Sequence, residues 1–206
     1  MQSIVTGVQS MPAWELIAVV LAITYLLLAI RENVWCWLFA FTSTAIYTLL
    51  FWDVSLFMDS ALNVYYMAMA VFGWYQWTRG GTNGDRHSNV LSVQTMSGKQ
   101  HALVISLTTF LSLVSGFLLS EHSTAAWPYI DSFTTWASVI ATYLVARKYL
   151  QNWLYWIVID AVSVPLYIER GLYMTALLFV AYIVMAYVGY ISWRKTLHGN
   201  RQNVAA

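Results

Sequence analysis

Seven long stretches with almost no charged side chains constrain this chain more than any other feature of its sequence. A helix needs about 20 mainly apolar residues to cross the hydrocarbon core of a membrane. The stretches span residues 12–30, 34–52, 54–77, 102–119, 131–147, 152–168 and 171–193. Only 9% of the residues are charged, whereas a soluble domain usually has about 25%. The sequence therefore predicts an all-α membrane protein with seven transmembrane helices.

Composition and motifs exclude several other classes of protein. A formal net charge of +1 gives no reason to expect nucleic-acid binding. The single cysteine, Cys36, excludes an internal disulfide, and the histidines are not clustered at the spacing of metal ligands. We find no phosphate-binding glycine loop and no Ser/His/Asp arrangement, so we expect neither an enzyme nor a cofactor. The first eleven residues lack Lys and Arg, which favours a retained first helix over a signal peptide.

Basic side chains predict the orientation in the membrane. With seven spans, nine of the ten Lys and Arg residues fall on one side, and only Arg170 falls on the other. The nine are Arg31, Arg79, Arg86, Lys99, Arg147, Lys148, Arg194, Lys195 and Arg201. Short cytoplasmic loops carry an excess of Lys and Arg. We therefore expect a bacterial inner (plasma) membrane protein with an external N-terminus and a cytoplasmic C-terminus.

The chain also resembles itself when Arg31–Arg79 is placed over Arg147–Lys195. Without a gap, the aligned identical residues include Trp37 and Trp153, Tyr66 and Tyr182, Gly73 and Gly189, and Trp77 and Trp193. Apolar composition alone does not account for Trp, Tyr and Gly matching in one register. The pattern predicts that spans one to three repeat as spans five to seven.

This repeat predicts three parts. They are a three-helix repeat at 1–79, a cytoplasmic linker plus connecting transmembrane helix at 80–129, and a second three-helix repeat with a cytoplasmic tail at 130–206. The connecting helix makes the two copies parallel, an organisation found in transporters that hold substrate near the midplane. A duplicated membrane protein without transport activity is the alternative. Residues 80–100 have four glycines and no hydrophobic period, so we expect a flexible linker.

Span six carries the clearest candidate chemistry. Trp153, Trp156, Asp160 and Ser163 have the spacing of one helix face, and Asp160 lies near the middle of the span. A carboxylate inside a membrane is costly and indicates a function. Two indoles and a carboxylate can stack on a flat aromatic ligand and neutralise its charge. The alternatives are an interfacial tryptophan belt and a protonated Asp160 that bridges helices.

Other candidates lie on spans three and seven. Asn63 and Tyr66 share a face of span three, where Asn63 can donate and accept hydrogen bonds. Tyr66 and its repeat mate Tyr182 are expected to line the site or to pack the two copies. Gly73 and Gly189 are expected to permit close helix approach rather than to bind a ligand.

These residues resemble the PnuC-type bacterial vitamin transporters. The stretch GWYQW at Gly73–Trp77, with Asn63 upstream, is similar to the end of that family's third core helix. Residues 147–178 resemble its second copy, in which a motif like ENWLLW precedes an Asn or Asp and then a glycine turn. The resemblance covers about 29–193. It implies a 3+1+3 fold related to the SWEET sugar transporters, a homotrimer, and facilitated diffusion made directional by a cytoplasmic kinase that phosphorylates the vitamin.

The resemblance also implies substrate contacts and candidate substrates. By motif, Asn152, Trp153, Trp156 and Asp160 correspond to the substrate-binding helix, and Asn63 to a polar position that is often Gln in nicotinamide riboside carriers. Asp160 stands where those carriers have Asn. We therefore expect a small aromatic cationic B vitamin, with thiamine, the substrate of the PnuT branch, favoured over nicotinamide riboside. A membrane scaffold or channel without a specific solute is the more distant alternative.

Overall fold

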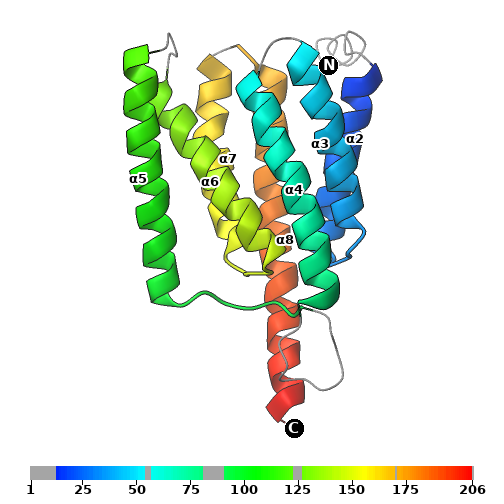
Figure 1. Cartoon of the computed structure of the whole chain (residues 1–206). Helices are drawn as coiled ribbons and strands as arrows, with labels where there is room; N and C mark the ends of the chain where they lie inside the picture. Colours follow the sequence, from blue (N-terminus) through cyan, green and yellow to red (C-terminus); the bar gives the residue numbers. More distant parts are fainter. Residues whose placement is uncertain (1–12, 54–56, 81–90, 123–126, 170, 206) are drawn as a thin grey trace. The chain divides into compact units, whose positions relative to one another are not determined.

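The computed structural model describes residues 13–53, 57–80, 91–122, 127–169 and 171–205. In these residues the chain is helical almost throughout, with a single isolated β-bridge. The helices are α2 (Ala13–Ile30), α3 (Cys36–Asp53), α4 (Phe57–Arg79), α5 (Gly98–His122), α6 (Pro128–Ala146), α7 (Asn152–Glu169) and α8 (Tyr173–Ala205) (Figure 1). Each predicted span is thus confirmed as a helix. Arg86 and Arg170, which entered the orientation prediction, lie outside the described residues.

The described chain forms two compact units. Unit 1 contains α2, α3 and α4, together with Ala146–Lys148 and the end of α8 from Ile191 onward. Within it, α3 packs against both α2 and α4 (Figure 1). Unit 2 contains 93–145 and 149–190, and so includes α5, nearly all of α6, α7 and the first part of α8. These units do not test the three-part division at 79 and 129, which stays a prediction.

The turns that end α2 and α6 have the same backbone hydrogen bonds. Asn33 N donates to Leu28 O, and Tyr149 N donates to Leu144 O, both at 3.0 Å. Each bond closes a Schellman motif, in which the residue before the donor has a left-handed backbone. Those residues are Glu32, with φ 55°, and Lys148, with φ 53°. They are 116 residues apart, which is the shift of the sequence repeat.

A tryptophan packs over a glycine in each unit. In unit 1 the indole of Trp37, on α3, lies directly against Gly73 of α4. In unit 2 the indole of Trp153, on α7, lies against Gly189 of α8, so that a Cβ built there would be 2.7 Å from the ring. Both indoles are buried. The two glycines therefore permit close approach, as predicted, and the group that approaches is an indole ring.

Unit 1 contains a buried ion pair that the sequence did not reveal. Lys148 Nζ lies 3.0 Å from Glu32 Oε2, and their side chains are 4% and 19% exposed. The same ammonium lies 4.6 Å from the centroid of the Trp77 ring. Trp77 in turn makes edge contacts with Trp37 and Trp193, at centroid distances of 5.3 and 5.9 Å. Lys148 is thus buried between a carboxylate and an indole ring, although the sequence indicated only a cytoplasmic loop charge.

The prediction of a flexible linker through Gln100 is wrong for residues 91–100. Val93 and Met96 are buried, and α5 already begins at Gly98. The helix starts there because Ser97 and Gln100 form a capping box. Gln100 Oε1 accepts a hydrogen bond from Ser97 N at 2.7 Å, and Ser97 Oγ accepts one from Gln100 N at 3.4 Å. Residues 81–90 of the predicted linker lie outside the described part of the chain.

Helix length and composition alone support membrane insertion for part of the fold. Among the described residues, Gly98–His122 and Thr175–Gly199 are long and apolar enough to cross a membrane, and α2 contains the shorter apolar stretch Leu16–Ile30. The other helices are diluted by hydroxyl groups, amides and carboxylates. Their polar residues are therefore where a function should be sought.

Candidate functional site

The predicted stripe on α7 lies mostly inside unit 2. Trp153, Asp160 and Ser163 are buried, and Trp156 is half-buried. Their helical spacing places them on one face, as the sequence predicted. The helix continues across Pro165 to Glu169. Ser163 Oγ donates to Ile159 O of the same helix at 2.9 Å, so its hydroxyl is already used.

Asn152 and Trp153, at the beginning of α7, have contacts that build the fold. Asn152 is 0% exposed, and its Nδ2 donates to Tyr149 O at 2.6 Å, which closes the turn before the helix. Its Oδ1 is buried and accepts no hydrogen bond from the described residues. Trp153 is 1% exposed against Gly189. In this conformation, then, both of these predicted substrate contacts face protein.

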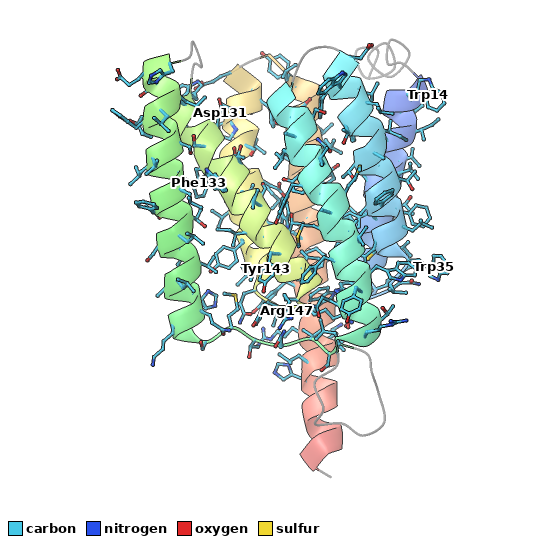
Figure 2. The ribbon with its side chains drawn as sticks, viewed as in Figure 1. Trp14, Trp35, Asp131, Phe133, Tyr143 and Arg147 are labelled. Atoms are coloured by element: carbon cyan, nitrogen blue, oxygen red, sulfur yellow. The ribbon has the colours of Figure 1, made fainter. Side chains whose placement is uncertain are left out.

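Trp156 packs beside the core of unit 2. The core cluster consists of Ala137 and Ala141 of α6 and Ile159 of α7, and Phe133, Tyr155 and Trp156 pack against it. Figure 2 shows Phe133 on α6, in the half of that helix nearer to Asp131. Small side chains on α6 leave room for the rings from α7. Trp156 is thus fixed by the core while part of its indole stays accessible.

Asp160 follows one helical turn after Trp156 on the same face. Its side chain is 4% exposed. Among the described residues, it forms no ion pair and no hydrogen bond. A buried carboxylate without a partner is costly, whether it is ionised or protonated. A bound cation would offset that cost, and an adjacent indole offers such a cation a π face.

Tyr182 lies on α8, within unit 2. Its ring is 5.7 Å from that of Phe179, which lies 4.8 Å from the ring of Tyr167 on α7. This aromatic row joins α7 to α8. Tyr182 therefore packs within its own unit, and its ring is half-buried.

The predicted residues on α4 lie in unit 1. Asn63 Nδ2 donates to Asp59 O of the same helix at 2.9 Å, which leaves its amide oxygen to accept a hydrogen bond. Tyr66 is half-buried, and its ring lies 5.7 Å from that of Tyr65. Both side chains keep partial exposure on one face of α4, in agreement with their predicted spacing.

Three consecutive hydroxyl groups of α3 donate hydrogen bonds to backbone oxygens. Thr42 Oγ1 donates to Leu38 O and Thr44 Oγ1 donates to Ala40 O, each within α3. Ser43 Oγ is buried and donates to Ala18 O of α2 at 2.8 Å. These three hydroxyl groups therefore already have backbone acceptors within the protein. Within the described residues, no three His, Cys, Asp or Glu side chains come together at a distance that could hold a metal ion.

The sequence of this chain is similar to those of known transporters. The family model described as "Nicotinamide mononucleotide transporter" matches residues 12–195. The nicotinamide riboside transporter PnuC of Escherichia coli (strain K12) is 24% identical over 196 residues, which cover 85% of this chain and 81% of the relative. The riboflavin/roseoflavin transporter RibM of Streptomyces davaonensis is 24% identical over 180 residues, covering 87% and 83%.

A solved structure shows the same fold. The crystal structure of the vitamin B3 transporter PnuC superposes with a TM-score of 0.71, covering 96% of this chain and 87% of that chain. The sequence identity is 21%, so this likeness bears on the fold alone. The all-α arrangement predicted from seven apolar stretches is therefore that of a known membrane transporter.

Proposed function

Because the chain belongs to the nicotinamide mononucleotide transporter family, we propose that it takes up a cationic aromatic B vitamin by facilitated diffusion, with thiamine ranked first. Family membership makes it a multi-pass vitamin transporter of the inner membrane, of the PnuC type, and not an enzyme. The proposal concerns which vitamin it carries and how.

Asp160 is the observation that carries the substrate proposal. It is a buried carboxylate without a protein partner in the described residues, and it follows the half-buried indole of Trp156. Thiamine has a permanent positive charge and an aminopyrimidine whose amino group and ring nitrogens suit a carboxyl partner. A ligand of this kind would stack on Trp156 and satisfy Asp160.

Nicotinamide riboside is the second candidate, because relatives from Escherichia coli, Haemophilus influenzae and Neisseria mucosa are named as its transporters. It is also cationic, so charge alone does not separate it from thiamine. Riboflavin, named for the relative from Streptomyces davaonensis, is uncharged and would leave Asp160 without a counter-charge. The carboxylate therefore favours the two cationic vitamins.

Titration of purified protein tests the substrate. Thiamine, nicotinamide riboside and riboflavin are titrated separately while tryptophan fluorescence is followed, and uptake of each is measured in proteoliposomes. We expect thiamine to have the lowest Kd and riboflavin the highest. Tighter binding of nicotinamide riboside would overturn the ranking, and absence of binding and uptake for all three would overturn the proposed function.

Facilitated diffusion has its own test. The chain carries no nucleotide-binding motif, and Asp160 is the one carboxylate predicted near the middle of a span. Uptake into proteoliposomes should stop when inside and outside concentrations are equal, and collapsing Na⁺ and H⁺ gradients should not change its rate. Accumulation of unmodified vitamin above the outside concentration would refute this mechanism.

We propose two further partners from the family resemblance. One is a cytoplasmic kinase that traps the vitamin as its phosphate, without a need for contact with the transporter. The other is a second and a third copy of this chain in a homotrimer. Light scattering of the purified protein should then give three times 23.5 kDa after correction for detergent, and a monomer mass would contradict the trimer.

A further inference from the structure

The segment at residues 94–101, between the two repeats, holds the beginning of α7 at several points within unit 2. Gln94 forms a parallel β-bridge with Tyr149, and Gln94 O accepts a hydrogen bond from Leu150 N at 2.8 Å. Met96 N donates to Gln151 Oε1 at 3.0 Å. The contacted residues form the turn that leads directly into α7.

Contacts from α5 continue this interaction into α7 itself. Gln100, which also caps α5, donates through Nε2 to Tyr149 Oη at 3.2 Å. His101 Nδ1 and Tyr155 Oη form a hydrogen bond of 2.8 Å, and the two rings stack at 29° with centroids 5.9 Å apart. Tyr155 precedes Trp156, and both pack against the core cluster of unit 2. The contacts therefore reach the part of α7 that presents Trp156.

Among the described residues, the corresponding turn in unit 1 has no β-bridge and no hydrogen bond that matches the one between His101 and Tyr155. At the repeat positions of Tyr149, Gln151 and Tyr155 the chain has Asn33, Trp35 and Phe39. Phe39 lacks the hydroxyl group that Tyr155 offers to His101, and Trp35 is 55% exposed, at the outer edge of its unit (Figure 2). Within the described ranges, the only β-bridge is the one at Tyr149. Repeat symmetry alone therefore does not require these contacts.

We propose that residues 94–101 are a positioning clamp for α7, and that His101 and Tyr155 are its positioning residues. The clamp fixes the rotation of α7 and its position along the membrane normal, so that Trp156 and Asp160 are positioned to contact the vitamin. This inference rests on the proposed function, because the position of α7 affects transport only if that helix contacts the substrate. It gives the connecting helix α5 a role beyond restoring the orientation of the second repeat.

Two single variants test the hydrogen bond and keep the stacked rings. His101→Phe and Tyr155→Phe should each raise the Kd for thiamine about threefold to tenfold, the effect expected for one net hydrogen bond. The double variant should be no worse than either single variant, because both remove the same bond. His101→Gln, which can still reach a hydroxyl group, should recover part of the affinity. His122→Phe is the matched control, since His122 is exposed and contacts Leu118 O of its own helix.

Hydrogen exchange supplies a readout that needs no ligand. The clamp variants should speed amide exchange in 152–160 of α7 and leave the repeat-related residues 36–44 of α3 unchanged. Faster exchange together with an unchanged Kd would overturn the proposal, as would additive effects in the double variant or the same Kd shift in His122→Phe. A lower melting temperature with unchanged Kd would show a structural role only, which also overturns it.

Failure of the clamp and failure of the proposed function give different results. Wild-type protein and Asp160→Asn are titrated in parallel with the same three vitamins. If wild-type protein binds none of them, the proposed function is wrong. If wild-type protein binds thiamine and Asp160→Asn weakens it, while the clamp variants bind normally, only the clamp is wrong.

Discussion

Two turns of the molecule can be compared, one between α2 and α3 and the other between α6 and α7. They share a left-handed residue and the same Schellman hydrogen bond, but they lead into helices with different side chains. At the positions of Trp156 and Asp160 in α7, helix α3 has Ala40 and Thr44. Thr44 satisfies its hydroxyl on Ala40 O, whereas Asp160 has no partner in the described protein. The two turns therefore keep a common backbone, and of these two matched positions only Asp160 lacks a partner among the described residues.

The ion pair between Lys148 and Glu32 links the two turns, and breaking it tests how much this link stabilises the protein. Lys148→Met removes the ammonium and leaves the partly buried Glu32 carboxylate without its partner. We expect a stability loss of about 3 kcal/mol, the lower end for a broken buried pair because Glu32 keeps some contact with water. Chemical denaturation in detergent measures it. Lys195→Met, at an exposed lysine of α8, is the control, and an equal loss in both variants would show that burial of Lys148 contributes nothing.

Asp160→Asn tests the difference in chemistry between α7 and α3. Losing a charge-assisted contact should weaken thiamine binding roughly tenfold to a hundredfold, or about 1.5–3 kcal/mol. The melting temperature should change much less, because no protein partner is lost. Thr44→Val, at the corresponding position of α3, should leave the Kd unchanged. Normal thiamine affinity in a well-folded Asp160→Asn variant would remove Asp160 from the site.

The paired glycines test the similarity of the two packing arrangements. Gly73→Ala and Gly189→Ala each place a methyl group inside an indole contact. Overpacking of this kind should cost about 1–3 kcal/mol, and the two losses should be similar. Thermal unfolding of both variants measures them. A large loss at one glycine and none at the other would show that one indole moves aside easily.

Labelling from outside intact cells tests whether the first turn and the beginning of α5, which contacts the second turn, share a side of the membrane. Trp35→Cys and Lys99→Cys, each in a Cys36→Ala background, should remain unmodified by an impermeant reagent because both are predicted to be cytoplasmic. Glu121→Cys, at the other end of α5, should react. Reaction of Lys99→Cys without lysis would reverse the predicted orientation.

Local sequence signals predicted much of the fold. The apolar stretches gave each described helix, and the resemblance to PnuC-type transporters is confirmed by the family match. The Ser97–Gln100 capping box was present in the sequence and could have placed the start of α5 correctly. The helices and the capping box depend on neighbours within a few residues, so the spacing of residues in the sequence is enough to predict them.

Side-chain partners at long range were decided by tertiary structure. The spacing of Trp153, Trp156 and Asp160 gave a common face, but only packing showed that Trp153 is buried against Gly189 while Trp156 keeps some exposure. The sequence likewise predicted Lys148 to be a charged residue in a cytoplasmic loop, and only the folded structure shows that it contacts Glu32 and Trp77. A residue's helix and face follow from local periodicity, whereas its partner depends on which distant surfaces pack together. That choice is made by the shape and burial of the whole core, and no local spacing encodes it.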